Sequence, residues 1–327
     1  MAYGNRNGGG ETDSLRLAPD EAFSVLGNET RLEILRTLGE AEGPLTYAEL
    51  YERVEYDDPS NFSYHLNKLV GHFVRKTDDG YYLYDAGRRV VEAVVSGAVS
   101  DSTVVEPTQT EKNCPFCGAS VAVGFQHGRV EQSCTECAGL VRFADSGGRR
   151  FTEYGSLGFF LLPPAGVQGR SPQEMLEAAW TWRHADFLMD SAGVCSRCSA
   201  KLETSVEVCE NHDAGAGVCD ECERRYAMRF ALYCPNCHYD PNSIAPGVLL
   251  ANTELLAFLT ARGINPFAPD SLNRASRALA QYDEEVVSVD PFEARLTFTA
   301  DGDSITLTLD DELSVIDVTR GQAGEAR

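Results

Sequence analysis

The cysteines are the residues whose type and spacing most directly indicate chemistry in this sequence. Ten of the eleven cysteines form five Cys-x-x-Cys pairs, and the eleventh begins the segment Cys209-Glu-Asn-His212. The five pairs are Cys114/Cys117, Cys134/Cys137, Cys195/Cys198, Cys219/Cys222 and Cys234/Cys237. Thiolates and imidazoles are the usual ligands of four-coordinate structural zinc. Eleven cysteines and His212 provide twelve ligands, which is enough for three tetrahedral zinc sites.

The first two pairs predict a zinc ribbon over residues 113–145. Sixteen residues separate Cys117 from Cys134, which is enough for a hairpin that brings the two Cys-x-x-Cys turns together. The segment 121–125 alternates as a strand of such a hairpin does. A site closed by four thiolates has no open position for water or substrate, so its expected role is folding rather than catalysis.

Eight ligands remain in residues 195–239, and they allow two groupings. The segments 199–208 and 223–233 read as strands, and each spans about 33 Å when extended, so the two ends of one strand cannot share an ion. If the strands pair antiparallel, the first cysteine pair joins the last and the four inner ligands form a second site. In the sequential alternative, each ten-residue stretch folds back as a tight hairpin. The nested grouping is preferred, and both groupings predict a double zinc-binding hairpin.

His212 is expected to complete the ligand set. His238 competes for this role because it directly follows Cys237, although a residue next to a ligand in such a turn usually aims its side chain away from the ion. The lone histidines His72, His127 and His184 are interpreted as surface or core residues.

The charge balance excludes a general affinity for nucleic acid. The 327 residues include 28 basic and 50 acidic ones, a net charge of -22, and only four of the basic residues are lysines. An acidic surface of this kind stays hydrated in molar salt, which indicates the cytosol of a halophile, with an ordinary acidic protein as the alternative. Any DNA binding must then come from a local patch. No segment is long and apolar enough to span a membrane or to act as a signal peptide, so a cytoplasmic protein is expected.

The arrangement of elements predicts an α+β protein with several modules. Residues 17–98 show a helical pattern with one short hairpin, in the order of four helices, two strands and a fifth helix. The remaining segments are listed by their expected role: a disordered tail over 1–16, a linker over 99–112, a connecting helical segment over 146–194, a C-terminal α+β domain with antiparallel strands over 240–320, and a tail over 321–327. Ser171-Pro172 begins the helix of the connecting segment, where Trp180 and Trp182 are interpreted as packing residues and a ligand pocket is the alternative.

Four stretches of the first 98 residues carry a resemblance to a known family. They read VLGNETRLEILRTL, LTYAELYERV, DPSNFSYHLNKLVGHFVRK and DGYYLYDAGRRVVEAV. They are similar to the winged helix-turn-helix domain of ArsR-type transcriptional regulators, in the variant frequent in haloarchaea. The cysteine pairs and the ending LTLDDELSVIDVTR also resemble a haloarchaeal regulator group. The resemblance implies a winged helix, binding of double-stranded DNA and a homodimer.

The helix that starts at Ser60 is the expected reader of DNA. Phe62, Leu66 and Leu69 face inward at helical spacing, so the outward positions can reach base edges and phosphates. The expected DNA-contacting residues are Ser60, Asn61, Ser63, Tyr64, Asn67 and Lys68 on this helix and Arg75 and Lys76 in the hairpin. Asparagine can pair with adenine through two hydrogen bonds, whereas lysine is the expected phosphate contact.

These observations predict a DNA-binding transcriptional regulator. Its zinc modules would serve dimerisation, binding of a partner in the transcription machinery, or effector sensing. One alternative is a zinc-scaffolded adaptor in which the winged helix binds protein partners. Another is a metal sensor in which one cysteine cluster exchanges its ion. No phosphate loop, nucleophile elbow or pair of tuned carboxylates is present, so no enzymatic activity is expected.

Overall fold

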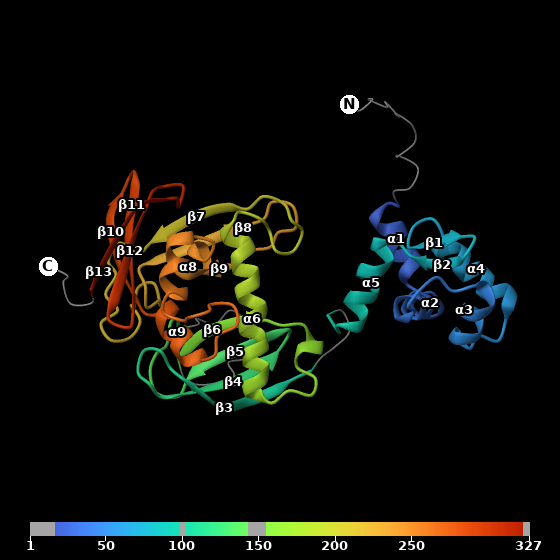
Figure 1. Cartoon of the computed structure of the whole chain (residues 1–327), viewed down its shortest axis with the longest axis horizontal. Helices are drawn as coiled ribbons and strands as arrows, with labels where there is room; N and C mark the ends of the chain where they lie inside the picture. Colours follow the sequence, from blue (N-terminus) through green and yellow to red (C-terminus); the bar gives the residue numbers. More distant parts are fainter. Residues whose placement is uncertain (1–16, 99–102, 143–154, 323–327) are drawn as a thin grey trace, which may run out of the picture. The chain divides into compact units, whose positions relative to one another are not determined.

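The computed structural model describes residues 17–98, 103–142 and 155–322, and the chain divides into two compact units, residues 1–101 and 102–327 (Figure 1). The expected tail over 1–16 lies outside the described residues. Within the described ranges, no helix combines the length and the apolar character needed to cross a membrane. The two units are described separately.

The first unit contains helices α1 to α4, a two-stranded antiparallel hairpin and helix α5, in the order that the sequence predicts. Local side chains set where these helices begin. Asn28 accepts a hydrogen bond from the Arg31 N–H, and Thr46 and Glu49 form a capping box. The bounds are Pro19–Leu26 for α1, Glu29–Glu40 for α2, Tyr47–Val54 for α3, Pro59–Leu69 for α4, Val74–Thr77 for β1, Gly80–Leu83 for β2 and Asp85–Val95 for α5.

Helix α4 packs against the core of the first unit through one apolar face. Phe62, Leu66 and Leu69 are fully buried, as their spacing predicts, and pack in one core with Ile34 of α2 and Leu50 of α3. Aromatic rings surround this face, and the Tyr51 and Phe62 rings meet edge to face with centroids 5.1 Å apart. The opposite face of α4 is left exposed to solvent.

The second unit begins with a four-stranded antiparallel sheet in the order β3-β4-β5-β6. Its strands are Val105–Asn113, Ser120–Gln126, Arg129–Cys134 and Ser156–Leu161. The sequence placed a linker over 99–112, but residues 105–113 form β3, and residues 99–102 lie outside the described part. Strand β6 likewise falls in the segment 146–194 that the sequence assigned to helical structure. The end of the predicted ribbon, near residue 145, also lies outside the described residues.

Helix α6 (Pro172–Ser191) crosses from this sheet toward a second hairpin (Figure 1). Its first residue follows Ser171, which forms a capping box with Glu174. Trp180 is buried on the face toward the sheet, whereas Trp182 is 46% exposed. The hairpin pairs β7 (Glu203–Val208) with β8 (Met228–Tyr233) antiparallel, from Glu203 opposite Tyr233 to Val208 opposite Met228. A short strand, β9 (Asn242–Ser243), adds to β8.

The C-terminal part of the second unit has three helices and a four-stranded antiparallel meander, β10-β11-β12-β13. Helices and antiparallel strands are both present there, as expected for residues 240–320, but β13 extends to Gln322, two residues into the expected tail. The bounds are Ala245–Leu249 for α7, Thr253–Thr260 for α8, Leu272–Ala280 for α9, Tyr282–Val289 for β10, Phe292–Ala300 for β11, Asp303–Leu309 for β12 and Val315–Gln322 for β13. The predicted mixed α+β class with antiparallel sheets is therefore confirmed.

One hydrophobic core joins the parts of the second unit. Fully buried Phe125 of β4, Phe230 of β8 and Phe298 of β11 belong to the same cluster. The loops that follow two of the cysteine pairs also lie side by side, because Arg142 N–H donates to the Glu223 carbonyl and Arg225 N–H donates to the Leu140 carbonyl, both at 2.8 Å. The cysteine segments and the C-terminal sheet are thus parts of one packed body.

Candidate metal centres

The twelve predicted ligands form three groups of four. The groups are Cys114, Cys117, Cys134 and Cys137; Cys195, Cys198, Cys234 and Cys237; and Cys209, His212, Cys219 and Cys222. Within each group the ligand atoms lie within 4.8 Å of one another. The structure therefore has the nested grouping of residues 195–237, and the sequential alternative is wrong.

The distances within the groups suit tetrahedral coordination. In the first group, the Sγ atoms of Cys117 and Cys134 are 3.4 Å apart, and in the second those of Cys195 and Cys237 are 3.6 Å apart. Four thiolates about 2.3 Å from a central zinc ion would be separated by roughly 3.8 Å. Three groups of four residues are therefore positioned to hold a metal ion.

The antiparallel register of β7 and β8 explains the nested grouping. Cys195 and Cys198 precede β7 and Cys234 and Cys237 follow β8, so pairing the two strands brings these four residues to one end of the hairpin. The inner ligands lie at the other end, where Cys209 directly follows β7. Each end of the hairpin therefore carries one group.

Four of the five Cys-x-x-Cys turns share one pattern of backbone hydrogen bonds. The residue after the second cysteine donates its N–H to the carbonyl of the first cysteine, as Gly118 does to Cys114 and Ser199 does to Cys195. Glu223 and His238 occupy the same position in the other two turns. All four residues have a positive φ, between 56° and 81°. This left-handed conformation turns the chain so that both thiols face the same point.

We expect the positive φ to make Gly118 the most sensitive of these four turn positions. Gly118→Val places a branched side chain in the left-handed region and should lower the stability of the full chain by about 1 to 3 kcal/mol. Ser199→Gly at the equivalent position should stay within about 0.5 kcal/mol of the parent, because glycine adopts this conformation without strain. Thermal unfolding of the metal-loaded chain measures both. Equal melting temperatures for the two variants would contradict this account of the turns.

His212, rather than His238, belongs to the third group. The Nδ1 atom of His212 lies 3.4 Å from the Cys222 Sγ, and its Nε2 lies 3.0 Å from the Arg225 carbonyl, to which it can donate. A hydrogen bond of this kind fixes the ring and its tautomer. The side chain of His238 lies beside Tyr233, with Nδ1 2.7 Å from the phenol oxygen. The expectation that His238 is aimed away from the ligands agrees with this contact.

Hydrogen bonds lower the pKa of one thiol in the second group and of one thiol in the third group. Hydrogen bonds from the Ala200 backbone and the Asn236 side chain lower the pKa of Cys198 to about 6. Backbone hydrogen bonds from Cys222 and Asp213 lower the pKa of Cys219 to about 6. Both groups outside the ribbon therefore contain a thiol that is deprotonated at neutral pH, which is the form that binds metal.

The predicted DNA-contacting residues lie on α4 and on β1 of the first unit. All of those on α4 are exposed except Ser63, which is half-buried with its hydroxyl 2.8 Å from the Tyr47 hydroxyl. Asn61 donates from Nδ2 to the Tyr56 hydroxyl at 2.7 Å. Tyr64 is 54% exposed, and the Lys68 Nζ lies 5.6 Å from its ring centroid. In β1, Arg75 and Lys76 are exposed.

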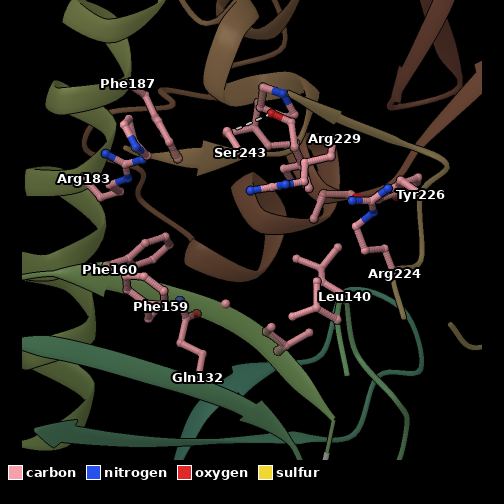
Figure 2. A pocket seen from close by; sticks show the side chains of 18 of the residues that line it. Gln132, Leu140, Phe159, Phe160, Arg183, Phe187, Arg224, Tyr226, Arg229 and Ser243 are labelled. Carbon is pink, nitrogen blue, oxygen red and sulfur yellow. Dashed lines mark hydrogen bonds between the residues drawn. The ribbon is translucent and has the colours of Figure 1, made fainter. Parts of the chain in front are cut away.

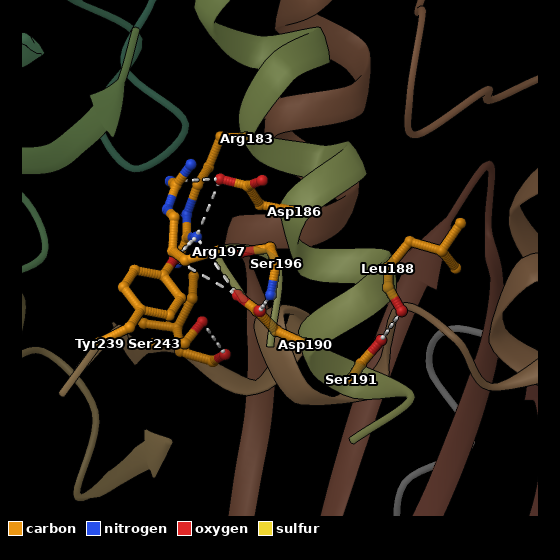
Figure 3. Close-up of polar contacts among 10 residues, drawn as sticks. Arg183, Asp186, Leu188, Asp190, Ser191, Ser196, Arg197, Tyr239 and Ser243 are labelled. Carbon is orange, nitrogen blue, oxygen red and sulfur yellow. Dashed lines mark hydrogen bonds and ion pairs between the residues drawn. The ribbon is translucent and has the colours of Figure 1, made fainter. Parts of the chain in front are cut away.

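A buried ion network beside the second metal group escaped the sequence analysis (Figure 3). Arg183 on α6 lies 3.5 Å from Asp190 and 3.8 Å from Asp186, and it donates to the Tyr239 hydroxyl at 2.8 Å. Arg197, which lies between Cys195 and Cys198 in sequence, pairs with Asp186 at 2.8 Å. Burial raises the pKa of Asp186 and of Asp190, and the neighbouring arginines oppose this rise. The network fastens α6 to the second metal group.

A cavity lies next to α6, where the sequence leaves a ligand pocket open as the alternative to packing (Figure 2). Lys112 of β3 lines it and is only 3% exposed, and burial lowers the pKa of its ammonium group to about 8, which leaves it charged at pH 7. His184 of α6 is also buried there, and its desolvation lowers the pKa of the imidazole to about 3, so the ring is neutral. Residues 176, 180, 183 and 184 of α6 are buried and recur at helical spacing. This spacing is the sequence signal for the side of the cavity that α6 forms.

The fold and its ligand groups define a mixed α+β protein with three four-ligand candidate metal centres in its second unit. The chain belongs to the family described as a domain of unknown function, DUF7351, whose model matches residues 111–315. A second family model, also described as a domain of unknown function, DUF7347, matches residues 19–94. The two matched ranges fall within the second and the first unit, respectively. No curated protein and no solved structure matches the chain.

Proposed function

We propose that the protein is a DNA-binding transcriptional regulator whose first unit is a winged helix. Helix α4 would be the recognition helix, and the hairpin of β1 and β2 would be the wing. The observation that carries the proposal is the division of α4 into two faces: one is fully buried, and the other exposes Asn61, Tyr64, Asn67 and Lys68. An α-helix that exposes a polar face can enter the major groove of duplex DNA.

The local charge supports this assignment in an acidic chain. Residues 59–69 of α4 contain no acidic residue, although acidic residues outnumber basic ones 50 to 28 in the chain. Lys68, Arg75 and Lys76 lie on α4 and the adjoining hairpin and are exposed. Phosphate contacts weaken as salt rises, by about 0.9 in log K per contact and per tenfold increase in salt. Base contacts from α4 would therefore carry much of the binding in a salt-rich cytosol.

The proposed partner of the first unit is a second copy of the chain. Each of the helices α1 and α5 leaves one large apolar side chain exposed: Phe23 of α1 is 76% exposed and Val95 of α5 is 60% exposed. A dimer interface that includes these helices would remove both side chains from water. A homodimer would present two α4 helices to one duplex.

Zinc is the proposed metal, in a structural role. Thiolate-rich tetrahedral ligand sets favour zinc among the common divalent ions. Each group offers four protein ligands, which would fill a tetrahedral coordination sphere and leave no position for a substrate. The ions would stabilise the second unit, which could then serve dimerisation, effector sensing or the binding of a partner.

We expect DNA binding to depend on two exposed side chains of α4. The full chain would first select duplexes from a random-sequence library in molar KCl, and fluorescence anisotropy would then measure binding to the selected duplex. Asn61→Ala combined with Tyr64→Ala should reduce affinity by at least tenfold, because one good contact to a base contributes about 1 to 3 kcal/mol. Lys68→Ala should instead lower affinity for all duplexes and reduce the salt slope by about 1.

Glu40→Ala provides the matched control, because Glu40 is exposed on α2 and not on the α4 face. Its affinity should equal that of the parent chain. Selection of no duplex, or unchanged affinity of the double variant, would reject α4 as a recognition helix. A first unit that binds protein partners in a zinc-scaffolded adaptor would then be the better proposal.

A further inference from the structure

A cavity of about 610 Å³ lies in the second unit between strands β5 and β6, helix α6 and the segment that carries β8 and β9 (Figure 2). Cavities of about 300 to 1,000 Å³ are typical of small-molecule sites. Aromatic rings form much of its wall, including those of Phe159 and Phe160 from β6 and Trp180 and Phe187 from α6. No metal-ligand group accounts for a space of this size.

The charge of the cavity wall is opposite to that of the chain. Six lining residues are cationic and only two, Glu223 and Asp240, are acidic, whereas the whole chain has 28 basic and 50 acidic residues. The six cationic residues are Lys112, Arg129, Arg142, Arg183, Arg224 and Arg229. An acidic chain that gathers cations around an apolar cavity is suited to an anionic ligand.

Four of these cations already have carboxylate partners. Arg183 pairs with Asp190, Arg142 with Asp220, and both Arg224 and Arg229 with Glu207. Among the described residues, no carboxylate lies within ion-pair distance of Lys112 or Arg129. Neither of these two cations is neutralised by an ion pair in this part of the chain.

Lys112 is the more informative of the two because it is buried. Its ammonium group donates to the Gln132 side-chain oxygen and lies 5.7 Å from the centroid of the Trp180 ring. Gln132 is 1% exposed, so water has little access to either group. A buried ammonium group is costly unless an anion or several hydrogen bonds compensate it. Besides the amide oxygen and the aromatic face, the Cys114 sulfur also favours the charged ammonium, but no carboxylate pairs with it.

Aromatic rings pack against one another beside Lys112. The rings of Trp180 and His184 stack at 4.0 Å with an interplanar angle of 16°, and Phe160 meets Trp180 edge to face at 5.9 Å. At the exposed side, the Arg129 guanidinium lies over the Phe159 ring at 4.5 Å. An apolar ligand body can pack against this wall while its charged end reaches a cation.

We infer that this cavity binds a small organic anion. A carboxylate or phosphate group of the ligand pairs with the Lys112 ammonium, and an apolar body lies against Phe160 and Trp180. Arg129 attracts the anion from the exposed side. The inference concerns the second unit alone and does not depend on DNA binding by the first.

Isothermal titration calorimetry of the metal-loaded full chain tests the inference with three probes of one shape: 2-naphthoate, 2-naphthyl phosphate and the neutral 2-naphthamide. At least one anion should bind tenfold more tightly than the amide, and the stronger anion identifies the headgroup. Lys112→Met, which removes the ammonium group and keeps an unbranched apolar side chain, should reduce the affinity for that anion to that of the amide.

Lys201→Met is the matched control, because Lys201 is an exposed lysine of the same unit outside the cavity. It should bind like the parent chain. Arg129→Gln, at an exposed position that leaves the core intact, provides an independent variant and should weaken binding of the anion about threefold or more. Equal affinity of the parent chain for the three probes, or no binding at millimolar concentration, would overturn the inference. So would a Lys112→Met chain that is folded and retains the preference for the anion.

Discussion

Replacing His212 with alanine should lower the metal content of the purified chain from three ions to two, whereas His238→Ala should leave three. Only His212 places a ring nitrogen among the thiols of its group. Structural zinc contributes apparent binding free energies of about 10 to 16 kcal/mol in small domains, comparable with the whole stability of a typical protein. Loss of one ion should therefore unfold the segment 209–225 locally.

Two measurements check this prediction. Mass spectrometry of the bound metal gives the number of ions per chain, and hydrogen exchange locates the segment that loses protection. Cys234→Ser is the positive control, because it removes a ligand of the second group at the opposite end of the hairpin. A loss of metal in His238→Ala and not in His212→Ala would assign the ligand to His238.

Arg183→Met should be the most damaging single change outside the metal ligands. The side chain of Arg183 is 7% exposed, and its removal leaves Asp186 and Asp190 buried with less compensating charge. Breaking a buried ion pair from one side typically costs about 3 to 5 kcal/mol, which corresponds to a fall in melting temperature of roughly 10 °C for a unit of this size. Arg295→Met, which breaks an exposed pair with Glu285, should cost less than about 1 kcal/mol.

The same variant should show a distinctive pH dependence. Burial already raises the pKa of Asp186 and of Asp190 in the folded protein. A carboxyl group whose folded pKa is raised contributes stability below its unfolded pKa and loses that contribution as pH rises through the folded value. Without Arg183 the two pKa values rise further, so the deficit relative to the parent chain should be largest at pH 7 and smaller at pH 5. A deficit that does not change with pH would mean that lost packing against Phe187, rather than lost charge, is responsible.

Spacing in the sequence was sufficient to predict the metal ligands. The segments 199–208 and 223–233 are too long for ligands at the two ends of one strand to share an ion. The structure accordingly has the nested grouping. The same reasoning located the buried face of α4, because Phe62, Leu66 and Leu69 repeat at helical spacing. In both cases the prediction uses residues that are close together in the sequence or that belong to one pair of strands.

Features that depend on several distant segments were not predictable in this way. Strand β3 has a polar sequence and contains Pro107, so it reads as a linker, yet its pairing with β4 is determined by the neighbouring strand. Lys112 on this strand contacts Trp180 of α6 and Gln132 of β5, and both lie far from it in sequence. Trp180 and Trp182 both read as packing residues, but Trp182 is exposed and Trp180 is buried. The periodicity of α6 favours burial of Trp180. The residues that line the cavity range from Lys112 to Ala280, so the α6 pattern indicates only one part of its wall.

The two ligand groups at the ends of the β7–β8 hairpin have a consequence for sequence variation. A strand is usually held in register by alternating apolar side chains, since a slip of one residue would expose them. In this hairpin, coordination bonds at both ends would add a second constraint on the alignment. Val206 and Val208 of β7 pack against the core, whereas Glu203 is exposed. Substitutions should therefore accumulate more freely at Glu203 than at the two valines or at the ligands that bracket the strand.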